Sequence, residues 1–235
     1  MVNDDDEHQY RNDWRRKSFL LTMFGALQSF VLIPLAALFY TGGTENNTSS
    51  PGFSVIENFL SDLGMITAYS GQPNLVSSLL FNSSLFLFGV FLILLFLAMP
   101  DFFKGQKEAK WLSYTGSVTG IFMAATFIGG SLTPADIFRP IHLMFGAMAF
   151  LSTLPVVIFY TLAILVSEDY PNWNAIGFVA LGVVILIYFG LLINSGASGD
   201  VAIFFTLGQK VVVFLILTFF LVEAYGALRF KQRPV

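Results

Sequence analysis

The chain has 235 residues, of which 55% are apolar and only 11% are charged. A soluble domain carries about 25% charged residues, so the composition excludes an ordinary soluble protein and predicts an all-α, polytopic membrane bundle. The formal net charge is −3, and the absence of cysteine excludes disulfides, thiolate catalysis and Cys-type zinc sites.

Six segments are apolar enough to cross a bilayer, which takes about 20 residues per helix. Backbone polar groups inside lipid must be paired internally, so each segment should be helical. The segments are Ser18–Tyr40, Leu75–Met99, Trp111–Leu132, Phe138–Val166, Trp173–Ser195 and Val201–Leu228. We therefore expect a polar N-terminal tail over 1–17, a single transmembrane domain over 18–228 and a basic C-terminal tail over 229–235. The N-terminal tail lacks the pattern of a signal peptide.

Lys and Arg residues set the expected orientation, because they are enriched in cytoplasmic loops. Ten of the twelve lie on one side of a six-span arrangement, and only Arg139 and Lys210 lie on or near the other. The ten are Arg11, Arg15, Arg16, Lys17, Lys104, Lys107, Lys110, Arg229, Lys231 and Arg233. We expect both termini to be cytoplasmic and the long loop between the first two spans to face outward from a cell membrane.

The end of that loop, "SVIENFLSDLG", has the pattern of a short amphipathic helix over 54–64. Ser54 and Glu57 form a capping box, and Gly64 suits the end of the helix. Glu57, Asn58, Ser61 and Asp62 share the polar face. The simplest interpretation is a helix that lies on the outer interface or covers the bundle, with its polar face in water.

The start of the fourth span, "TPADIFRPIHLMFG", adds a second group of polar residues. Arg139 and His142 are three residues apart and project from neighbouring parts of one helical face. His142 lies about one turn inside the span, where ionisable side chains normally face the bundle interior or a wet cavity. Asp136, Asp62 and Glu57 are candidate partners for Arg139. An interface anchor for Arg139 and a structural hydrogen bond for His142 are the simpler alternatives.

The sixth span carries Lys210, which lies roughly 14 Å below its outer end at about 1.5 Å per residue. A lysine at that depth should pair with an acid, extend outward or lose its charge. Asp200 is a candidate partner. A snorkelling lysine is the simpler interpretation.

Small residues at helix spacing, such as Gly116 and Gly120, allow helices to approach closely. They favour packing within the chain, and a homo-oligomer is the alternative.

The order of these features resembles a known family. The element "FLSDLG", with Ser61, Asp62 and Gly64, precedes "PNLVSSLLFNSSLFLFGVFL", and the later "PADIFRPIHLMFGAMAF" contains Asp136 and His142. This pattern is similar to domain-of-unknown-function family 998, small archaeal and bacterial multi-pass membrane proteins, and more distantly to the Frag/DRAM/Sfk type. The resemblance covers about residues 18 to 228. It implies a connection with membrane lipids and no assigned reaction.

Three functional hypotheses follow. The first is an outward-facing polar pocket that binds membrane lipid or a small ligand through Glu57, Ser61, Asp62, Asp136, Arg139, His142, Asp200 and Lys210. The second is a lipid-modifying enzyme with Asp62 or Glu57 as base and His142 as acid or ligand. The third is a proton- or ion-coupled transporter in which Lys210 and a carboxylate titrate. We expect membrane lipids as partners, no nucleic acid, no cofactor and no metal site, because no ligand spacing indicates one.

Overall fold

The computed structural model describes residues 4–168, 170–194 and 202–229, and over them the chain forms six long α-helices without a β-strand. All six are long and apolar enough to cross a membrane, so the predicted six-helix, all-α fold is confirmed. They are α1 (Asp4–Leu38), α2 (Leu75–Ala98), α3 (Lys107–Ser131), α4 (Ala135–Val166), α5 (Asn174–Asn194) and α6 (Ala202–Arg229). Two short 3-10 helices, η1 (Leu60–Gly64) and η2 (Met99–Phe103), lie between them.

The first helix extends further than the apolar pattern indicates. It begins at Asp4, so most of the polar segment predicted as a tail is helical. The part suited to a membrane begins only at Asp13. Hydropathy marks where a helix can meet lipid, and polar residues such as those at the start of α1 can continue the same helix beyond it.

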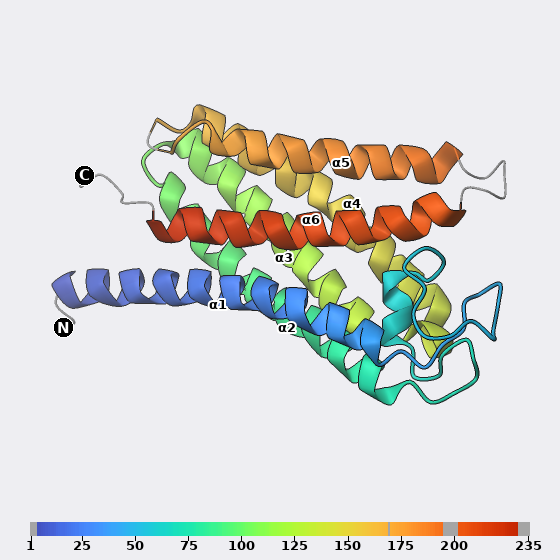
Figure 1. The fold of residues 1–235 in the computed structure, drawn as a ribbon. Helices are drawn as coiled ribbons and strands as arrows, with labels where there is room; N and C mark the ends of the chain where they lie inside the picture. Colours follow the sequence, from blue (N-terminus) through green and yellow to red (C-terminus); the bar gives the residue numbers. More distant parts are fainter. Residues whose placement is uncertain (1–3, 169, 195–201, 230–235) are drawn as a thin grey trace.

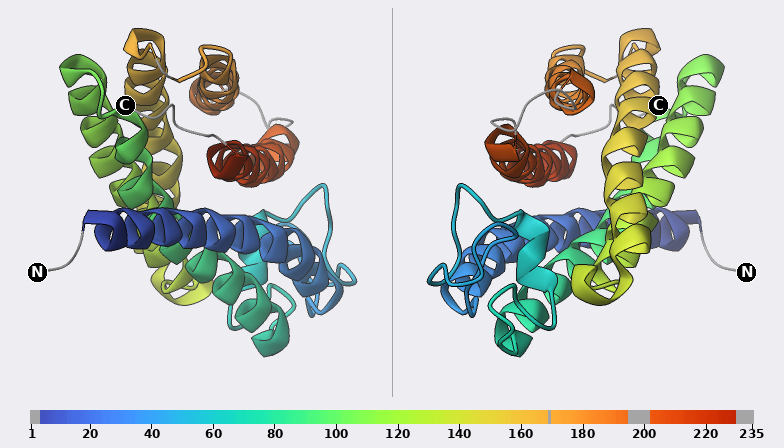
Figure 2. Two further views of the ribbon diagram at one scale, coloured as in Figure 1. Left: turned by 90° about the vertical axis from the view of Figure 1, so that its left-hand side faces the viewer. Right: turned by 90° about the vertical axis from the view of Figure 1, so that its right-hand side faces the viewer.

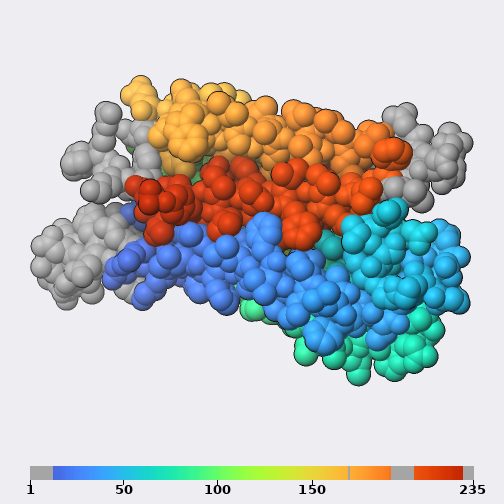
Figure 3. Space-filling model, viewed as in Figure 1, coloured from blue at the N-terminus to red at the C-terminus, as the bar shows by residue number. Residues whose placement is uncertain are grey.

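The helices form a ring. Each packs against the next one along the chain, and α6 returns to pack against α1. Figure 1 shows both termini at one end of the bundle and the long α1–α2 loop at the other. The end-on views in Figure 2 separate the α1–α2, α3–α4 and α5–α6 pairs, and Figure 3 shows α1, α6 and α5 side by side on one face.

Aromatic side chains fill the centre of the ring. Phe88 and Phe96 from α2 both pack against Phe220 of α6, and Phe96 also contacts Tyr160 of α4. Tyr160 is fully buried, and its hydroxyl lies 2.6 Å from that of Ser117 on α3. A buried tyrosine needs such a partner for its hydroxyl. This core fixes the end of the bundle that lies away from the long loop.

The glycines of α3 serve packing within the chain, as their spacing favours. A Cβ atom on Gly116 would lie 2.8 Å from the ring of Tyr160, and one on Gly120 would lie 2.5 Å from the ring of Phe96. Side chains larger than hydrogen would therefore push α3 away from α4 and α2.

Candidate functional site

The loop between α1 and α2 folds back over the end of the bundle. Gly43 has φ +85°, and a Cβ there would lie 2.3 Å from the backbone nitrogen of Ser70, so only glycine fits this crossing of two loop segments. The carbonyl oxygen of Gly43 accepts hydrogen bonds from Tyr40 Oη at 3.3 Å and Asn58 Nδ2 at 3.1 Å. This crossing places the second half of the loop against the helices.

The predicted helix over 54–64 forms as two shorter pieces, a turn and then η1. The first half of the capping box is present, because the Glu57 N–H donates to Ser54 Oγ at 3.2 Å. The second half is different: Ser54 N donates to Asn58 Oδ1 at 2.9 Å, so Asn58 takes the place expected for the Glu57 carboxylate. The Glu57 residue is exposed.

Gly64 ends η1, but its backbone is not in the left-handed conformation. The expected capping role therefore does not explain why glycine is needed here. A Cβ on Gly64 would lie 2.6 Å from Asn82 Oδ1 of α2. The Gly64 carbonyl oxygen accepts hydrogen bonds from Ser78 Oγ at 2.9 Å and Asn82 Nδ2 at 3.0 Å. Glycine therefore allows η1 to lie directly against the start of α2.

The expectation that the whole polar face of this segment lies in water is wrong. Asn58 is fully buried and Asp62 is only 5% exposed. Asp62 Oδ2 accepts hydrogen bonds from Asn58 Nδ2 at 3.1 Å and from the Phe59 N–H at 2.9 Å. The chain turns between the two pieces, so these side chains point inward and their polar groups are satisfied within the protein.

One face of α6 holds the backbone of this segment. Gln209 Oε1 accepts a hydrogen bond from the Leu60 N–H at 2.7 Å, and Thr206 Oγ1 donates to the carbonyl oxygen of Ile56. Lys210 Nζ donates to the carbonyl oxygen of Asn58 at 2.5 Å. The three residues of α6 lie at helical spacings of three and four, so they share the face that meets the loop.

Lys210 was expected to pair with an acidic side chain, and its ammonium group instead donates hydrogen bonds to backbone carbonyl oxygens. Its Nζ also donates to the carbonyl oxygen of Thr206 at 2.9 Å and lies 5.6 Å from the centre of the Phe53 ring. The residue is 9% exposed. Asp200, the expected partner, lies outside the residues that the structure describes.

The first turns of α4 bring the second polar group to the same end of the bundle. The backbone of Phe138 leaves helical geometry, with φ −123° and ψ 40°, because Pro140 disrupts the helix around it. Asp136 accepts hydrogen bonds at Oδ1 and Oδ2 from the N–H groups of Ile66 and Thr67, at 3.1 and 2.9 Å. The α1–α2 loop is thereby attached to α4 as well as to α6.

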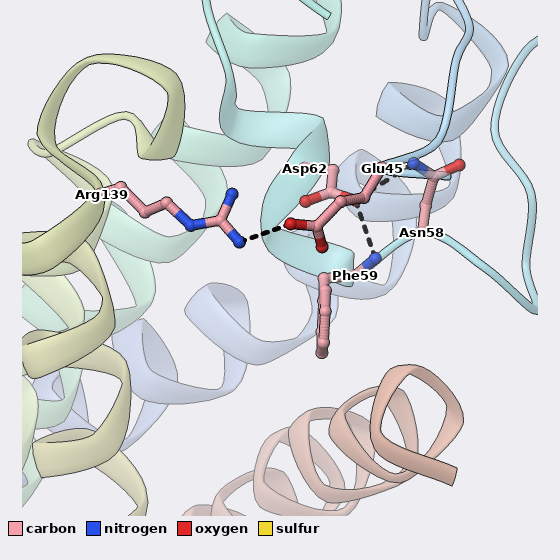
Figure 4. Close-up of polar contacts among 5 residues, drawn as sticks. All are labelled: Glu45, Asn58, Phe59, Asp62 and Arg139. Atoms are coloured by element: carbon pink, nitrogen blue, oxygen red, sulfur yellow. Dashed lines mark hydrogen bonds and ion pairs between the residues drawn. The ribbon is translucent and has the colours of Figure 1, made fainter. Parts of the chain in front are cut away.

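Arg139 pairs with an acid that was not among its predicted partners. Its Nη2 lies 2.8 Å from Oε1 of Glu45, and both side chains are about half exposed. Figure 4 shows Arg139 pointing from α4 toward Glu45, with the carboxylate of Asp62 turned to the same space. An exposed pair of this kind contributes at most about 1 kcal/mol, so it can exchange partners easily.

His142 is fixed by a backbone contact. Its Nδ1 lies 2.7 Å from the carbonyl oxygen of Thr133. A carbonyl oxygen can only accept, so Nδ1 carries the proton of this bond and Nε2 is the acceptor of the neutral ring. The backbone partners that the described residues give the ring are the carbonyl oxygens of Thr133 and Gly130, which only accept, so none of them donates to Nε2.

These elements enclose a cavity of about 250 Å³ between η1, α4, α5 and α6. Its polar lining consists of Ser61, Asp62, Tyr69, Arg139, His142 and Gln209. Aromatic rings, among them Phe59, Phe150 and Phe205, form much of the remaining wall. A second cavity of about 70 Å³ lies toward α2 and α3 and shares Ser61, His142 and Gln209 with the first.

Burial changes the acidity of three loop residues, of which Asp62 and Tyr69 line this cavity. It raises the pKa of Asp62 to about 6, although the hydrogen bonds from Asn58 and Phe59 act in the opposite direction. Burial also raises the pKa of Tyr40 to about 12 and that of Tyr69 above its usual range. At neutral pH Asp62 is therefore mainly a carboxylate, with both tyrosines protonated.

The cavity brings together Ser61, Asp62, Arg139 and His142. No hydrogen bond or ion pair between the described residues joins Asp62, Arg139 and His142 to one another, and each has its own protein partner. Asp136 and Lys210 hold the loop and are not among the residues that line the cavity, and Glu57 is exposed and does not line it either.

Glu45, Asn58, Tyr69 and Gln209 were not among the predicted site residues. In the sequence, Gln209 stands next to Lys210, and Asn58 stands one helical turn before Asp62. These positions beside predicted site residues are the local indication of a role for Gln209 and Asn58. No sequence pattern pairs Glu45 with Arg139.

The chain matches no protein-family model, no curated protein and no solved structure. The resemblance to family 998 therefore stays a prediction. Over the described part of the chain, no three His, Cys, Asp or Glu side chains lie close enough together to hold a metal ion.

Proposed function

We propose that this is an integral membrane protein that binds a phosphate-bearing membrane lipid, with the headgroup in the 250 Å³ cavity. The supporting observation is the lining of the cavity, which combines the buried carboxylate of Asp62, the half-exposed guanidinium of Arg139 and several aromatic and aliphatic side chains. We call the part beside Asp62 the inner end and the part beside Arg139 the mouth. Ligand cavities typically combine such an apolar surface with a few polar groups that fix orientation. On the basis of the Lys and Arg distribution, the cavity faces outward.

The mouth favours a lipid over a soluble molecule. Leu143 lines the cavity and is 59% exposed, and Ala147, one turn further along α4, is also exposed. In a helix suited to crossing a membrane these side chains face lipid. An acyl chain can leave the cavity past them, while the phosphate remains beside Arg139.

The test is retention of lipid by the purified protein. Gly146 lines the cavity, and a Cβ there meets nothing within 4 Å, so Gly146→Phe should add a ring beside the cavity without a clash at its Cβ. Gly226→Phe on α6 is the matched control, because its Cβ is also free of contacts. We expect native mass spectrometry to find bound phospholipid in the wild type and the control, and much less in Gly146→Phe and Arg139→Ala.

Two results would contradict the proposal. One is equal lipid retention in Gly146→Phe and Gly226→Phe. The other is complete displacement of the lipid by excess soluble glycerophosphate, which would identify a small phosphate ester as the ligand instead.

A lipid-modifying reaction is the second candidate, and the position of His142 favours it. Its Nε2 is free to take a proton, and Ser61, whose hydroxyl has no hydrogen bond among the described residues, lines the same two cavities. A fluorophosphonate probe should then label the wild type and fail to label Ser61→Ala. An unlabelled wild type would remove this candidate.

A further inference from the structure

The cavity has an unequal distribution of charge between its inner end and its mouth. Asp62 is 5% exposed, and only its Oδ2 takes part in the described hydrogen bonds. Oδ1 is therefore an acceptor without a hydrogen-bond partner in a group that lines the cavity. Arg139 at the mouth is about half exposed.

His142 adds a second acceptor at the inner end. The carbonyl oxygen of Thr133 holds its Nδ1 proton, which leaves Nε2 with a lone pair. His142 and Asp62 come from different elements, α4 and η1, and both line the same cavity. A ligand group that satisfies both acceptors must donate hydrogen bonds.

The aromatic lining of the cavity suits a positive charge. Phe59, Tyr69, Tyr188, Phe189 and Phe205 line the cavity, and aromatic faces attract ammonium groups. Lys210 acts on Asp62 electrostatically but makes no hydrogen bond or ion pair with it, because its Nζ is directed to the carbonyl oxygens of Asn58 and Thr206. The Asp62 carboxylate thus has room for a cation of the ligand.

The mouth suits the opposite charge. Arg139 has five N–H donors, and its ion pair with Glu45 uses Nη2. Because the pair is exposed and weak, a phosphate can share or replace Glu45. A phosphate at Arg139 and an ammonium group at Asp62 then lie at the two ends of one ligand.

We propose that the headgroup is zwitterionic, an aminoalkyl phosphate whose ammonium group reaches Asp62 and His142 while its phosphate stays beside Arg139. This inference rests on the proposed function and deepens it by naming the headgroup class.

The experiment is competition between two lipids on the full-length protein in detergent, read by native mass spectrometry at pH 7.5. Phosphatidylethanolamine and phosphatidylglycerol of the same chain length are added in equal amounts. They differ in the ammonium group and share the phosphate. We expect about a tenfold preference for phosphatidylethanolamine, the size that one hydrogen bond to a charged group confers.

Asp62→Asn should reduce this preference to near one, because the amide lacks the negative charge. Glu57→Gln, a change of an exposed acid in the same loop, should leave the preference unchanged. If Asp62→Asn fails to fold, acidification of the wild type gives the same information. Going from pH 7.5 to 5 neutralises Asp62, whose pKa is about 6, and should abolish most of the preference.

Other groups around Asp62 bear on that pH dependence. Tyr40, Glu45 and Tyr69 from the loop and Lys210 from α6 act on Asp62 electrostatically, and Arg139 and His142 from α4 share its cavity. Protonation of His142 removes the second acceptor, so it acts in the same direction as protonation of Asp62.

The outcomes separate the two proposals. Equal binding of both lipids, or a preference for phosphatidylglycerol, with both lipids lost in Gly146→Phe, overturns the zwitterionic headgroup and leaves the lipid cavity standing. A preference that persists in Asp62→Asn and at pH 5 also overturns it. Lipid binding that is unchanged in Gly146→Phe removes the cavity itself.

Discussion

Among single residues, Lys210 has a structural role that a stability measurement can isolate. Its Nζ satisfies two backbone carbonyl oxygens, those of Asn58 and Thr206. In Lys210→Met the Asn58 carbonyl oxygen would lose its charged donor inside the protein. We expect a loss of about 2 kcal/mol of unfolding free energy, within the range for hydrogen bonds to charged groups. Thermal unfolding in detergent measures it. Lys107→Met, at an exposed position, is the control, and equal effects of both changes would contradict the role.

Asp62 should make the stability of the protein depend on pH. Burial raises its pKa in the folded state from 3.8 to about 6, so its contribution to stability is fully present below pH 3.8 and is lost as pH rises through about 6. In detergent without added lipid, the melting temperature of the wild type should therefore fall from pH 5 to pH 8 relative to that of Asp62→Asn. Parallel pH profiles for the two proteins would show that Asp62 is not buried as described.

At the scale of elements, the attachment of the α1–α2 loop to α4 depends on Asp136. Its carboxylate accepts from the N–H groups of Ile66 and Thr67. In Asp136→Ala these amides should exchange with solvent deuterium about tenfold faster, as expected when a hydrogen bond to a charged group is lost. Glu57→Ala removes an acid from the same loop whose carboxylate makes no hydrogen bond to the described residues. Comparable acceleration in both variants would contradict the attachment.

The elements also show what sequence can predict here. The thickness of a bilayer sets how many consecutive apolar residues a spanning helix needs, and this length and hydropathy can be read from each segment by itself. All six helices are identified in this way. The segment 54–64 is different, since Asn58 turns inward to reach Gly43 and its carbonyl oxygen meets Lys210. An amphipathic pattern describes an isolated helix and cannot include such distant partners. The same reason explains why Glu45 was missed as the partner of Arg139.

For the whole molecule, the two ends of the bundle carry different charges. Among the described residues, eight Lys and Arg residues belong to the end with the start of α1, the α2–α3 connection and the end of α6, and only Arg139 and Lys210 lie toward the end with the long loop. The positive residues should hold the first end in the cytoplasm. From this charge distribution we predict that the end with the cavity faces outward.

The absence of cysteine allows this orientation to be tested with single reporters. Glu57→Cys places a thiol in the exposed part of the α1–α2 loop, and Lys107→Cys places one at the start of α3, at the other end of the bundle. A membrane-impermeant maleimide added to intact cells should label Glu57→Cys and leave Lys107→Cys unlabelled until the membrane is opened. The reverse pattern would place the cavity in the cytoplasm. Labelling of both thiols in intact cells would mean that α2 does not cross the membrane, because α2 is the one long helix between these two positions.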